Sequence, residues 1–374
     1  MKYAFVSTIT HYPSGGADVL WTRAAARALA GGAEVLVVIP PAYAPHPAMR
    51  ALADAGARLL VRPGLSTYRG RLDGLRRSLR RWGGEQDAEA VLRKFAPDRT
   101  FFCQGGLADS MLEEGLLKVL GEGGHPFDLI CQSNDDNSLF TESERQRVKA
   151  LFGRARALWF VSQANRSRAE IQLAQPLPNA RLVQNPVDLP PAAALPWPGG
   201  DTVKLAVVAR WEPYPKGLDL LLPALGRALG AEPGWELRFH GRGEGRGYLE
   251  QLAEQHGIGA RVSFQGYATN IAEIWREHHL LLLPSRLEGC SLAMIEAMLS
   301  GRPVLATAVG GAPEWIEDGR EGFLCPAPTV ALLAETLTRA WKQRERWREL
   351  GLAANRRASA LRDPAPEERL LAPT

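Results

Sequence analysis

Hydrophobic residues form short runs along the chain, separated by stretches in which apolar residues recur at helical spacing. In the first half the runs are Tyr3–Ile9, Glu34–Ile39, Arg58–Val61, Thr100–Cys103, Asp128–Gln132, Leu158–Val161 and Arg181–Gln184. The second half repeats the pattern as Val203–Ala209, Glu236–His240, Val262–Gln265, Leu280–Pro284, Val304–Ala308 and Gly322–Cys325. Bounded runs of this length, alternating with helices, are typical of βαβ units and parallel sheets. The pattern predicts an α/β protein with two doubly wound, Rossmann-like domains.

A Pro- and Gly-rich segment at 186–200 separates the two series and indicates a hinge. We expect an N-terminal domain over 1–188, a linker over 189–202 and a C-terminal domain over 203–355. The tail, about 356–374, could pack back on the first domain. Two such domains joined by a hinge are expected to face a ligand cleft at the carboxyl ends of their strands.

Composition narrows the class of protein. The 374 residues are 45% hydrophobic and 23% charged, with a net charge of only +4, which gives no indication of a nucleic-acid partner. The four cysteines have no paired spacing, which favours a reducing compartment and argues against a zinc site. No apolar stretch approaches the roughly 18–20 residues of a membrane helix. We expect a cytoplasmic protein, which could lie at the inner face of the membrane.

One segment departs from the α/β pattern. Arg69–Trp82 is strongly basic, and its apolar residues Leu72, Leu75, Leu79 and Trp82 fall at helical spacing. It is either a surface helix that packs this stripe on the core, or a helix that lies on anionic lipid or meets an acidic acceptor. The sequence leaves both interpretations open.

The segment 281–306 carries the clearest candidate chemistry. An apolar strand ends at Pro284, and a helix is expected to begin near Ser291 and to stop at Gly301. Gly289 allows the backbone to approach a ligand closely. The free amides of the helix's first turn form a site for a phosphate-type anion.

Two carboxylates flank this predicted anion site. Glu288 stands on the loop before the helix, and Glu296 follows in its second turn. Carboxylates would repel phosphates, but they can accept hydrogen bonds from the hydroxyls of a sugar and a ribose on either side of a diphosphate. The alternative for Glu296 is a solvated helix residue, which the neighbouring Ala293 and Ala297 make less attractive. The arrangement suits a nucleotide-sugar.

Cations that match a diphosphate are expected nearby. Arg210 ends the apolar strand of the second half, and Lys216 follows just ahead of a helix. An arginine fork and a lysine point charge commonly bind phosphate oxygens together, although each alone is more often a surface charge. The glycine-rich run at 241–247 gives little support for NAD, because Arg246 occupies the third glycine position.

These residues lie in motifs that can be assigned to a family. ARWEPYPKG, FHGRGE, VSFQGY, SRLEGCSLAMIEAM and GRPVLATAVGGAPEWIEDGREGFL cover most of 203–326. In this order they resemble the retaining GT-B glycosyltransferases of family 4, or group 1, which include bacterial sucrose-phosphate, mannosyl and lipopolysaccharide glycosyltransferases. The resemblance implies the GT-B fold, two Rossmann-like domains that face a cleft.

The resemblance also implies roles for the candidate residues. Glu288 and Glu296 match the E-x7-E pair, and Arg210 and Lys216 look like the diphosphate clamp. The 262–266 loop would hold the base. The further donor contacts that we carry over are Gly16, Gly241, Gly266, Gly289, Cys290, Ser291 and Leu292.

The match is thinner in the first half. Gly15 and Gly16 resemble the family's glycine loop, although a plain strand-to-helix turn would use the same residues. Asn185–Asp188 resembles the family's hinge motif, with proline in place of glycine.

Family members often carry a histidine after the strand at 128–132, where this chain has polar and acidic residues instead. Asn134 and Asp136 could bind acceptor or donor hydroxyls, or a carboxylate there could act as a base. Equally, Asp135 or Asp136 could cap the following helix. His11 is a separate candidate on the acceptor side.

The sequence therefore predicts sugar transfer from a UDP- or GDP-sugar to a sugar, lipid-linked or small-molecule acceptor, with retention and without a metal. Glu288, Arg210, Lys216 and Asp136 are the predicted catalytic residues. Cell-envelope polysaccharide, glycolipid or glycoconjugate synthesis is the expected setting. The alternatives are a nucleotide-sugar epimerase or hydrolase, a phosphorylase, or a non-catalytic subunit that only binds the donor.

Overall fold

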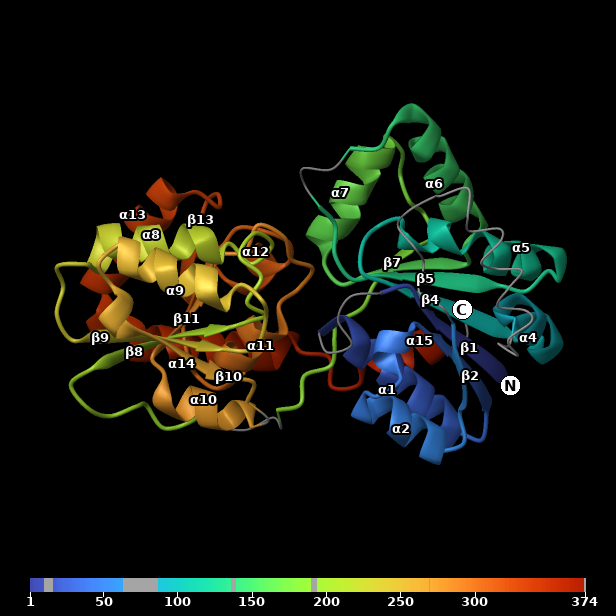
Figure 1. Cartoon of the computed structure of the whole chain (residues 1–374), viewed down its shortest axis with the longest axis horizontal. Helices are drawn as coiled ribbons and strands as arrows, with labels where there is room; N and C mark the ends of the chain where they lie inside the picture. The colour runs from blue at the N-terminus through green and yellow to red at the C-terminus, as the bar shows by residue number, and fades with distance from the viewer. Residues whose placement is uncertain (10–15, 63–86, 136–138, 190–193, 269, 373–374) are drawn as a thin grey trace. The chain divides into compact units, whose positions relative to one another are not determined.

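The computed structural model describes residues 1–9, 16–62, 87–135, 139–189, 194–268 and 270–372. It divides into two compact units, one of Met1–Pro186 with Pro364–Thr374 and the other of Val187–Asp363 (Figure 1). Four of the sequence-based predictions fall outside the described residues, namely those for His11, Gly15, Asp136 and the basic segment Arg69–Trp82.

The first unit is built on a parallel sheet. Among its described residues the order is β3-β2-β1-β4-β5-β6-β7. The strands are β1 Lys2–Ser7, β2 Glu34–Ile39, β3 Arg58–Val61, β4 Arg99–Gln104, β5 Phe127–Cys131, β6 Ala157–Phe160 and β7 Ala180–Leu182. Neighbouring strands are parallel throughout, for example with Phe5 opposite Val37 and Phe101. The chain reverses its direction of winding between β1 and β4.

Helices cover both faces of this sheet. They are α1 Gly16–Ala30, α2 Pro47–Asp54, α4 Ala88–Phe95, α5 Glu114–Glu122, α6 Glu142–Arg154, α7 Gln163–Leu173 and α15 Pro366–Leu371, with the 3-10 turns Pro41–Tyr43 and Asp109–Glu113. Alternate strand residues pack on α1, α2 and α15 on one face, and on α4 to α7 on the other. This division follows from the period-two alternation of side chains along a strand.

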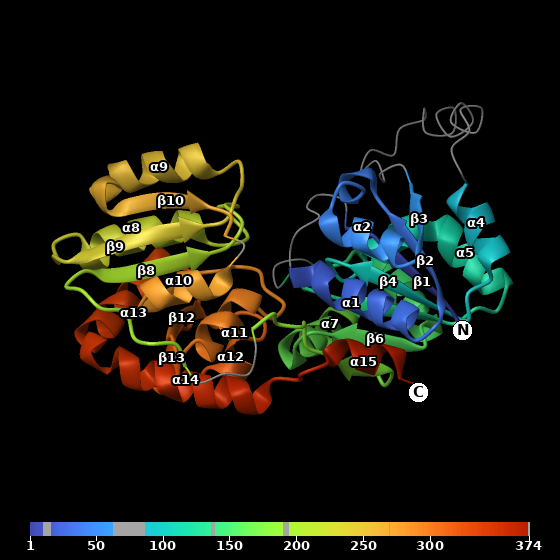
Figure 2. The ribbon, with the colours of Figure 1, turned by 90° about the horizontal axis from the view of Figure 1, so that it is seen from below.

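The end of the chain belongs to the first unit. Helix α15 packs beside α1, as both ribbon views show (Figures 1 and 2). Leu370 is fully buried in the core with α1, and Glu368 pairs with Arg27. The Arg99 side chain donates to the Ala372 carbonyl at 3.3 Å. These contacts attach the C-terminal segment to the sheet that the N-terminus begins.

The second unit has its own parallel sheet, in the order β10-β9-β8-β11-β12-β13 over the residues described. The strands are β8 Val203–Val208, β9 Trp235–His240, β10 Val262–Gly266, β11 Leu280–Leu283, β12 Val304–Thr307 and β13 Gly322–Cys325. Here the winding reverses between β8 and β11. Every residue of β11 is buried, as expected for a central strand covered on both faces.

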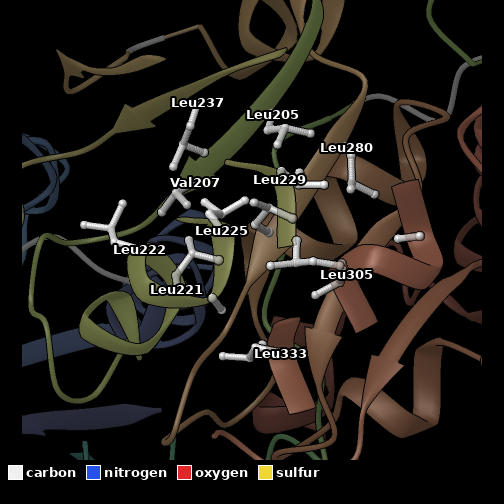
Figure 3. Close-up of a cluster of buried hydrophobic side chains, with 14 of the residues drawn as sticks. Leu205, Val207, Leu221, Leu222, Leu225, Leu229, Leu237, Leu280, Leu305 and Leu333 are labelled. Carbon is white, nitrogen blue, oxygen red and sulfur yellow. The ribbon is translucent and has the colours of Figure 1, made fainter. Parts of the chain in front are cut away.

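The helices of this unit are α8 Leu218–Leu229, α9 Arg246–Gln255, α10 Ile271–Glu277, α11 Leu292–Leu299, α12 Ala312–Trp315, α13 Val330–Lys342 and α14 Trp347–Leu361, with 3-10 turns at Gly259–Arg261 and Arg344–Arg346. Leucines of α8 interdigitate with those of the strands in a closely packed core (Figure 3). Helices α9 and α13 complete this layer, and α10 and α11 lie on the opposite face (Figure 1).

The predicted fold class is confirmed, because both sheets are parallel, and each predicted apolar run coincides with a strand. Among the described residues, none of the helices combines the length and the apolar character that a membrane crossing requires.

Candidate functional site

The predicted donor residues gather where the second sheet reverses its winding. β8 and β11 are adjacent, and the winding of the chain reverses between them. The carboxyl ends of the strands at such a reversal are the usual ligand position in open α/β sheets. Gly217 lets the two loops approach here. Its φ is +63°, and a Cβ there would lie 1.9 Å from the Pro284 carbonyl oxygen. Only glycine fits this approach without a shift of the backbone.

Lys216 and Glu288 meet across this point. The Lys216 Nζ lies 2.6 Å from Glu288 Oε1, and the Ser285 hydroxyl donates to the same oxygen at 2.9 Å. The side chains of this ion pair are 19% and 12% exposed. The Ser285 carbonyl accepts a hydrogen bond from Thr307 Oγ1 at 2.6 Å, which ties the loop to β12. The structure therefore holds a cation and a carboxylate in contact at the end of β8 and β11.

The second predicted cation lies on the same loop as Lys216. Arg210 pairs with Glu212 at 3.1 Å, and the Arg210 side chain is 39% exposed. Each predicted cation thus faces a carboxylate of its own. Both cationic side chains are partly exposed, so an anion can reach them.

Helix α11 begins at Leu292, four residues after Glu288. Ser291 is its N-cap residue and accepts from the Met294 amide at 3.4 Å. The Gly289 carbonyl accepts from the Gly311 amide at 2.7 Å, so the loop after β12 lies against this turn. Cys290 is buried, and burial raises the pKa of its thiol, so it is not a ready nucleophile. Leu292 is the first helical residue, as the predicted amide site requires.

Glu296 lies in the second turn of α11, between the buried Ala293 and Ala297. Burial raises the pKa of its carboxyl group to about 7. No hydrogen bond or ion pair of this group is found among the described residues. The side chain is partly buried, and its carboxyl oxygens can still accept hydrogen bonds. Its contact with a ligand stays a prediction.

Gly241 and Gly266 come together at the ends of β9 and β10. The Gly241 amide donates to the Gly266 carbonyl at 2.7 Å, and both residues have positive φ, 142° and 80°. A Cβ at Gly241 would lie 1.9 Å from the Ala209 carbonyl oxygen. The structure thus places both predicted glycines beside the loop that carries Arg210.

In the first unit the predicted residues that the structure describes differ in exposure. Asn134 is buried and donates to the Asn165 carbonyl at 3.5 Å, whereas Asp135 is exposed and its carbonyl accepts from Gln172 at 2.8 Å. Gly16 is the first residue of α1. Their roles toward a ligand stay predictions.

The helix after this segment begins differently from one expectation. Its N-cap is Thr141, whose side chain and that of Glu144 form a reciprocal capping box. The suggestion that Asp135 caps this helix is therefore wrong, because α6 begins only at Glu142. Where the family has a histidine, Gln132 exchanges side-chain hydrogen bonds of 3.0 and 2.8 Å with Asn185, which joins the ends of two segments 53 residues apart.

Sequence reasoning missed several residues of the site. Ser285 and Glu212 contact predicted residues and stand in the motifs quoted above, but no role was predicted for either. The spacing of Ser285, three positions before Glu288 in a loop, was the available signal. A buried pair in the first unit, Arg62 with Glu113, was also missed, because its members are 51 residues apart in sequence.

The second unit is similar in sequence to known proteins. Residues 202–343 match the protein family described as "Glycosyl transferases group 1". The D-inositol 3-phosphate glycosyltransferase of Nocardia farcinica is 35% identical over 159 residues, which cover 40% of this chain and 35% of that protein. The N-acetyl-alpha-D-glucosaminyl L-malate synthase of Bacillus anthracis is 37% identical over 101 residues, covering 27% of this chain and 26% of that one. The matched stretch therefore spans about a third or less of each relative's length.

The likeness in structure extends over the whole chain. Anabaena Alr3699/HepE, solved in complex with UDP-glucose, has a TM-score of 0.74 and 18% sequence identity, and the match covers 99% of this chain and 98% of that one. This likeness concerns the fold. The chain therefore has the GT-B fold, and its residues 202–343 are similar to the group 1 glycosyltransferases.

Proposed function

We propose that the protein transfers a sugar from a nucleoside diphosphate sugar, UDP- or GDP-linked, to an acceptor hydroxyl. The observation that carries the proposal is the contact of Lys216 with Glu288 at the β8–β11 edge, directly before the first turn of α11. A cation, helix amides and a carboxylate at one point match a diphosphate with a hydroxyl-bearing sugar beside it. The Anabaena neighbour was solved in complex with UDP-glucose, which supports a donor of this class.

In the proposed donor complex, the diphosphate takes up the charges of Arg210 and Lys216 and the amides at Gly289 to Leu292. Glu288 accepts hydrogen bonds from the sugar hydroxyls. Glu296 accepts them from the ribose, which suits a carboxyl group that has no other partner among the described residues. The base lies at the 262–266 strand end, where Gly241 and Gly266 leave no side chain in the way.

Lys216 has a double role in this proposal. It neutralises Glu288 in the free site, and it turns to the phosphate oxygens when a donor binds. Glu288 is then free to accept hydrogen bonds from the sugar, and Ser285 keeps it in place. Arg210 is proposed to exchange Glu212 for phosphate in the same way. Charge-for-charge exchange lowers the desolvation cost of binding the diphosphate.

In the proposed reaction the anomeric carbon–oxygen bond to the diphosphate breaks, and a bond to the acceptor oxygen forms. The leaving phosphate gains negative charge, which Arg210, Lys216 and the α11 amides stabilise as it develops. We propose front-face attack with retention, in which a leaving phosphate oxygen takes the acceptor proton. Glu288 orients the sugar as it acquires oxocarbenium character. The cations supply the charge that a metal ion would otherwise provide.

For the acceptor we keep His11, Asn134, Asp135 and Asp136 as proposed contacts. The acceptor class is a sugar, a lipid-linked sugar or a small molecule, in envelope polysaccharide, glycolipid or glycoconjugate synthesis. The relatives named above act on different acceptors, so the shared domain supports the donor chemistry and leaves the acceptor to experiment.

A thermal-shift panel with UDP, GDP, ADP and their sugars tests the proposal. One nucleotide class is expected to stabilise the protein, and Lys216→Ala or Arg210→Ala should weaken its binding about 10- to 150-fold, because each removes a charge-assisted contact. Donor hydrolysis without an acceptor then separates a transferase from a binding subunit. Unchanged nucleotide affinity in both variants would contradict the assigned clamp.

A further inference from the structure

Arg286 links the two loops that carry Lys216 and Glu288. Its guanidinium group grips the Asp219 carboxylate with two parallel hydrogen bonds of 2.6 and 2.8 Å. Asp219 lies in the first turn of α8, three residues after Lys216, and Arg286 lies two residues before Glu288. A bidentate pair of this kind fixes orientation as well as distance.

The same arginine makes further contacts with the Lys216 loop. Its side chain donates to the Tyr214 carbonyl at 2.9 Å and stacks over the Tyr214 ring at 4.6 Å. The backbone amides of Arg286 and Leu287 both donate to the Pro215 carbonyl, at 3.0 and 3.1 Å. The contacts therefore bracket Lys216 on both sides, at Tyr214–Pro215 and at Asp219.

We propose that Arg286 and Asp219 are positioning residues of the donor site, which hold Lys216 and Glu288 in register across the β8–β11 edge. The inference rests on the proposed function for its effect on donor turnover. Neither residue is assigned a contact with the donor, because their charged groups are engaged with each other and, for Arg286, with the Tyr214 carbonyl. They act on the reaction through the placement of the two residues that meet the diphosphate and the sugar.

The physical reason is that neither loop can hold this geometry alone. Lys216 has a long, flexible stem, and its nitrogen must meet Glu288 from a different loop, 72 residues away. A tethered loop loses little conformational entropy when it binds, whereas a free one must be ordered by the ligand. Displacement of a charged group by about 1 Å can lower a reaction rate by about 100-fold.

The second unit contains a matched control. Arg339 also grips an aspartate, Asp318, with two hydrogen bonds of 2.9 Å. It also contacts a backbone carbonyl, that of Leu324, and stacks over an aromatic ring, that of Phe323, at 5.4 Å. This pair joins the segment before β13 to α13, however, and contacts neither Lys216 nor Glu288. It has the same chemistry without the proposed positioning role.

The experiment compares Asp219→Asn and Arg286→Gln with Asp318→Asn and Arg339→Gln. Donor turnover gives kcat and KM, and thermal melting reports stability. Reductive methylation of Lys216, read by peptide mass spectrometry against the exposed Lys94, reports how closely Glu288 shields the lysine. Asp219→Asn is nearly isosteric, so it decides the question if Arg286→Gln does not fold.

We expect both site variants to methylate Lys216 several-fold faster and to lower kcat/KM for the donor about 10- to 100-fold. The double variant Asp219→Asn with Arg286→Gln should have a kcat/KM only slightly below that of the less active single variant, because the two residues act as a unit. The control pair is more exposed, so its variants should lower the melting temperature by no more than the site variants do, and they should leave Lys216 labelling and kcat/KM unchanged.

The inference is overturned if Lys216 labelling and kcat/KM are unchanged in the site variants, or if they change equally in the controls. Failure of the proposed function looks different. In that case the wild-type protein binds none of the nucleotides, while the labelling of Lys216 still shows whether Arg286 and Asp219 position it.

Discussion

The carboxyl ends of the two sheets both carry charged pairs, but of different kinds. In the second unit Lys216 and Glu288 are 19% and 12% exposed, whereas in the first unit Arg62 and Glu113 are 6% and 5% exposed. Arg62 also donates to the Ser7 carbonyl at 2.9 Å, so this pair connects the ends of β1 and β3 to the turn after β4. The Lys216–Glu288 pair is partly exposed where two loops meet, whereas the Arg62–Glu113 pair is buried inside the fold.

The same contrast appears in two carboxyl groups whose pKa burial raises to about 7, Glu296 in the second unit and Glu113 in the first. Glu113 has Arg62, which opposes that rise, while Glu296 has no charged partner among the described residues. The difference teaches that a partly buried carboxyl group without a partner is a candidate contact for a ligand, whereas a buried carboxyl group paired with a cation belongs to the internal structure.

The largest effect should come from breaking the closed pair. Arg62→Met leaves Glu113 buried without its cation and should cost about 3–5 kcal/mol of unfolding free energy. Lys216→Met should cost only about 1 kcal/mol, because Glu288 keeps the Ser285 hydrogen bond and reaches solvent. Urea unfolding measures both. The double variant Arg62→Met with Glu113→Gln should regain part of the loss. Equal destabilisation by Arg62→Met and Lys216→Met would remove the contrast between the two sheets.

A second prediction concerns pH and Glu296. Its folded pKa, about 7, lies above the unfolded value of 4.5, so the folded state binds the proton more tightly. The resulting stability is present below pH 4.5 and is lost as the pH rises to 7. Glu296→Gln should therefore be more stable than the wild type by about 2–3 kcal/mol near pH 8, with the difference vanishing at acid pH.

Nucleotide affinity provides the control for this prediction. If Glu296 accepts ribose hydroxyls, wild-type affinity should rise as the pH passes through 7 and the carboxyl group ionises. Glu296→Gln should show a flat profile over the same range. A stability difference between wild type and Glu296→Gln that is the same at pH 4.5 and at pH 8 would show that burial does not raise the pKa of this carboxyl group.

A third, smaller effect concerns the glycine at the end of β9. Gly241→Ala should destabilise the second unit by about 1–3 kcal/mol, because the residue has a φ of +142° and its Cβ would meet the Ala209 carbonyl. Gly247→Ala is the matched control. Nothing lies within 4 Å of its Cβ, and it sits in helix α9, so alanine should gain about 0.5–1 kcal/mol. Thermal melting of both variants would show whether close backbone approach, rather than glycine content, decides the outcome.

The smallest effect should be seen at the start of α6 in the first unit. Thr141→Ala removes the capping box and should cost about 1 kcal/mol, measured as faster amide exchange in the first turn of that helix. Asp135→Ala should leave the exchange of this turn unchanged. The opposite result would return the cap to the acidic segment.

The strands and the predicted donor residues were accessible from local pattern. Dense apolar runs such as Leu280–Leu283 have few alternatives to a buried strand, and charged residues at the ends of such runs fall at the ligand edge of a parallel sheet. The cap of α6 could also have been predicted, since Thr141 and Glu144 have the spacing of a capping box. The acidic residues before them were considered as the cap instead.

Contacts between residues that are far apart in the sequence could not be predicted from local pattern. Lys216 and Glu288 are 72 positions apart, and Arg286 and Asp219 are 67 apart. No local rule states that β8 and β11 are neighbours. Strand order depends on how the whole sheet buries its helices, and a single sequence carries no direct signal of it.

The sequence by itself determined the α/β class, the places of the strands and the residue types available for a diphosphate and a sugar, because periodicity and strand-end chemistry are local properties. Only the tertiary structure decided which of these residues meet. It brought Lys216 to Glu288, closed Arg62 on Glu113 and left Glu296 desolvated without a charged partner in the part of the chain that it describes. The reason is that burial and electrostatic pairing depend on sheet order and packing, which are properties of the folded chain as a whole.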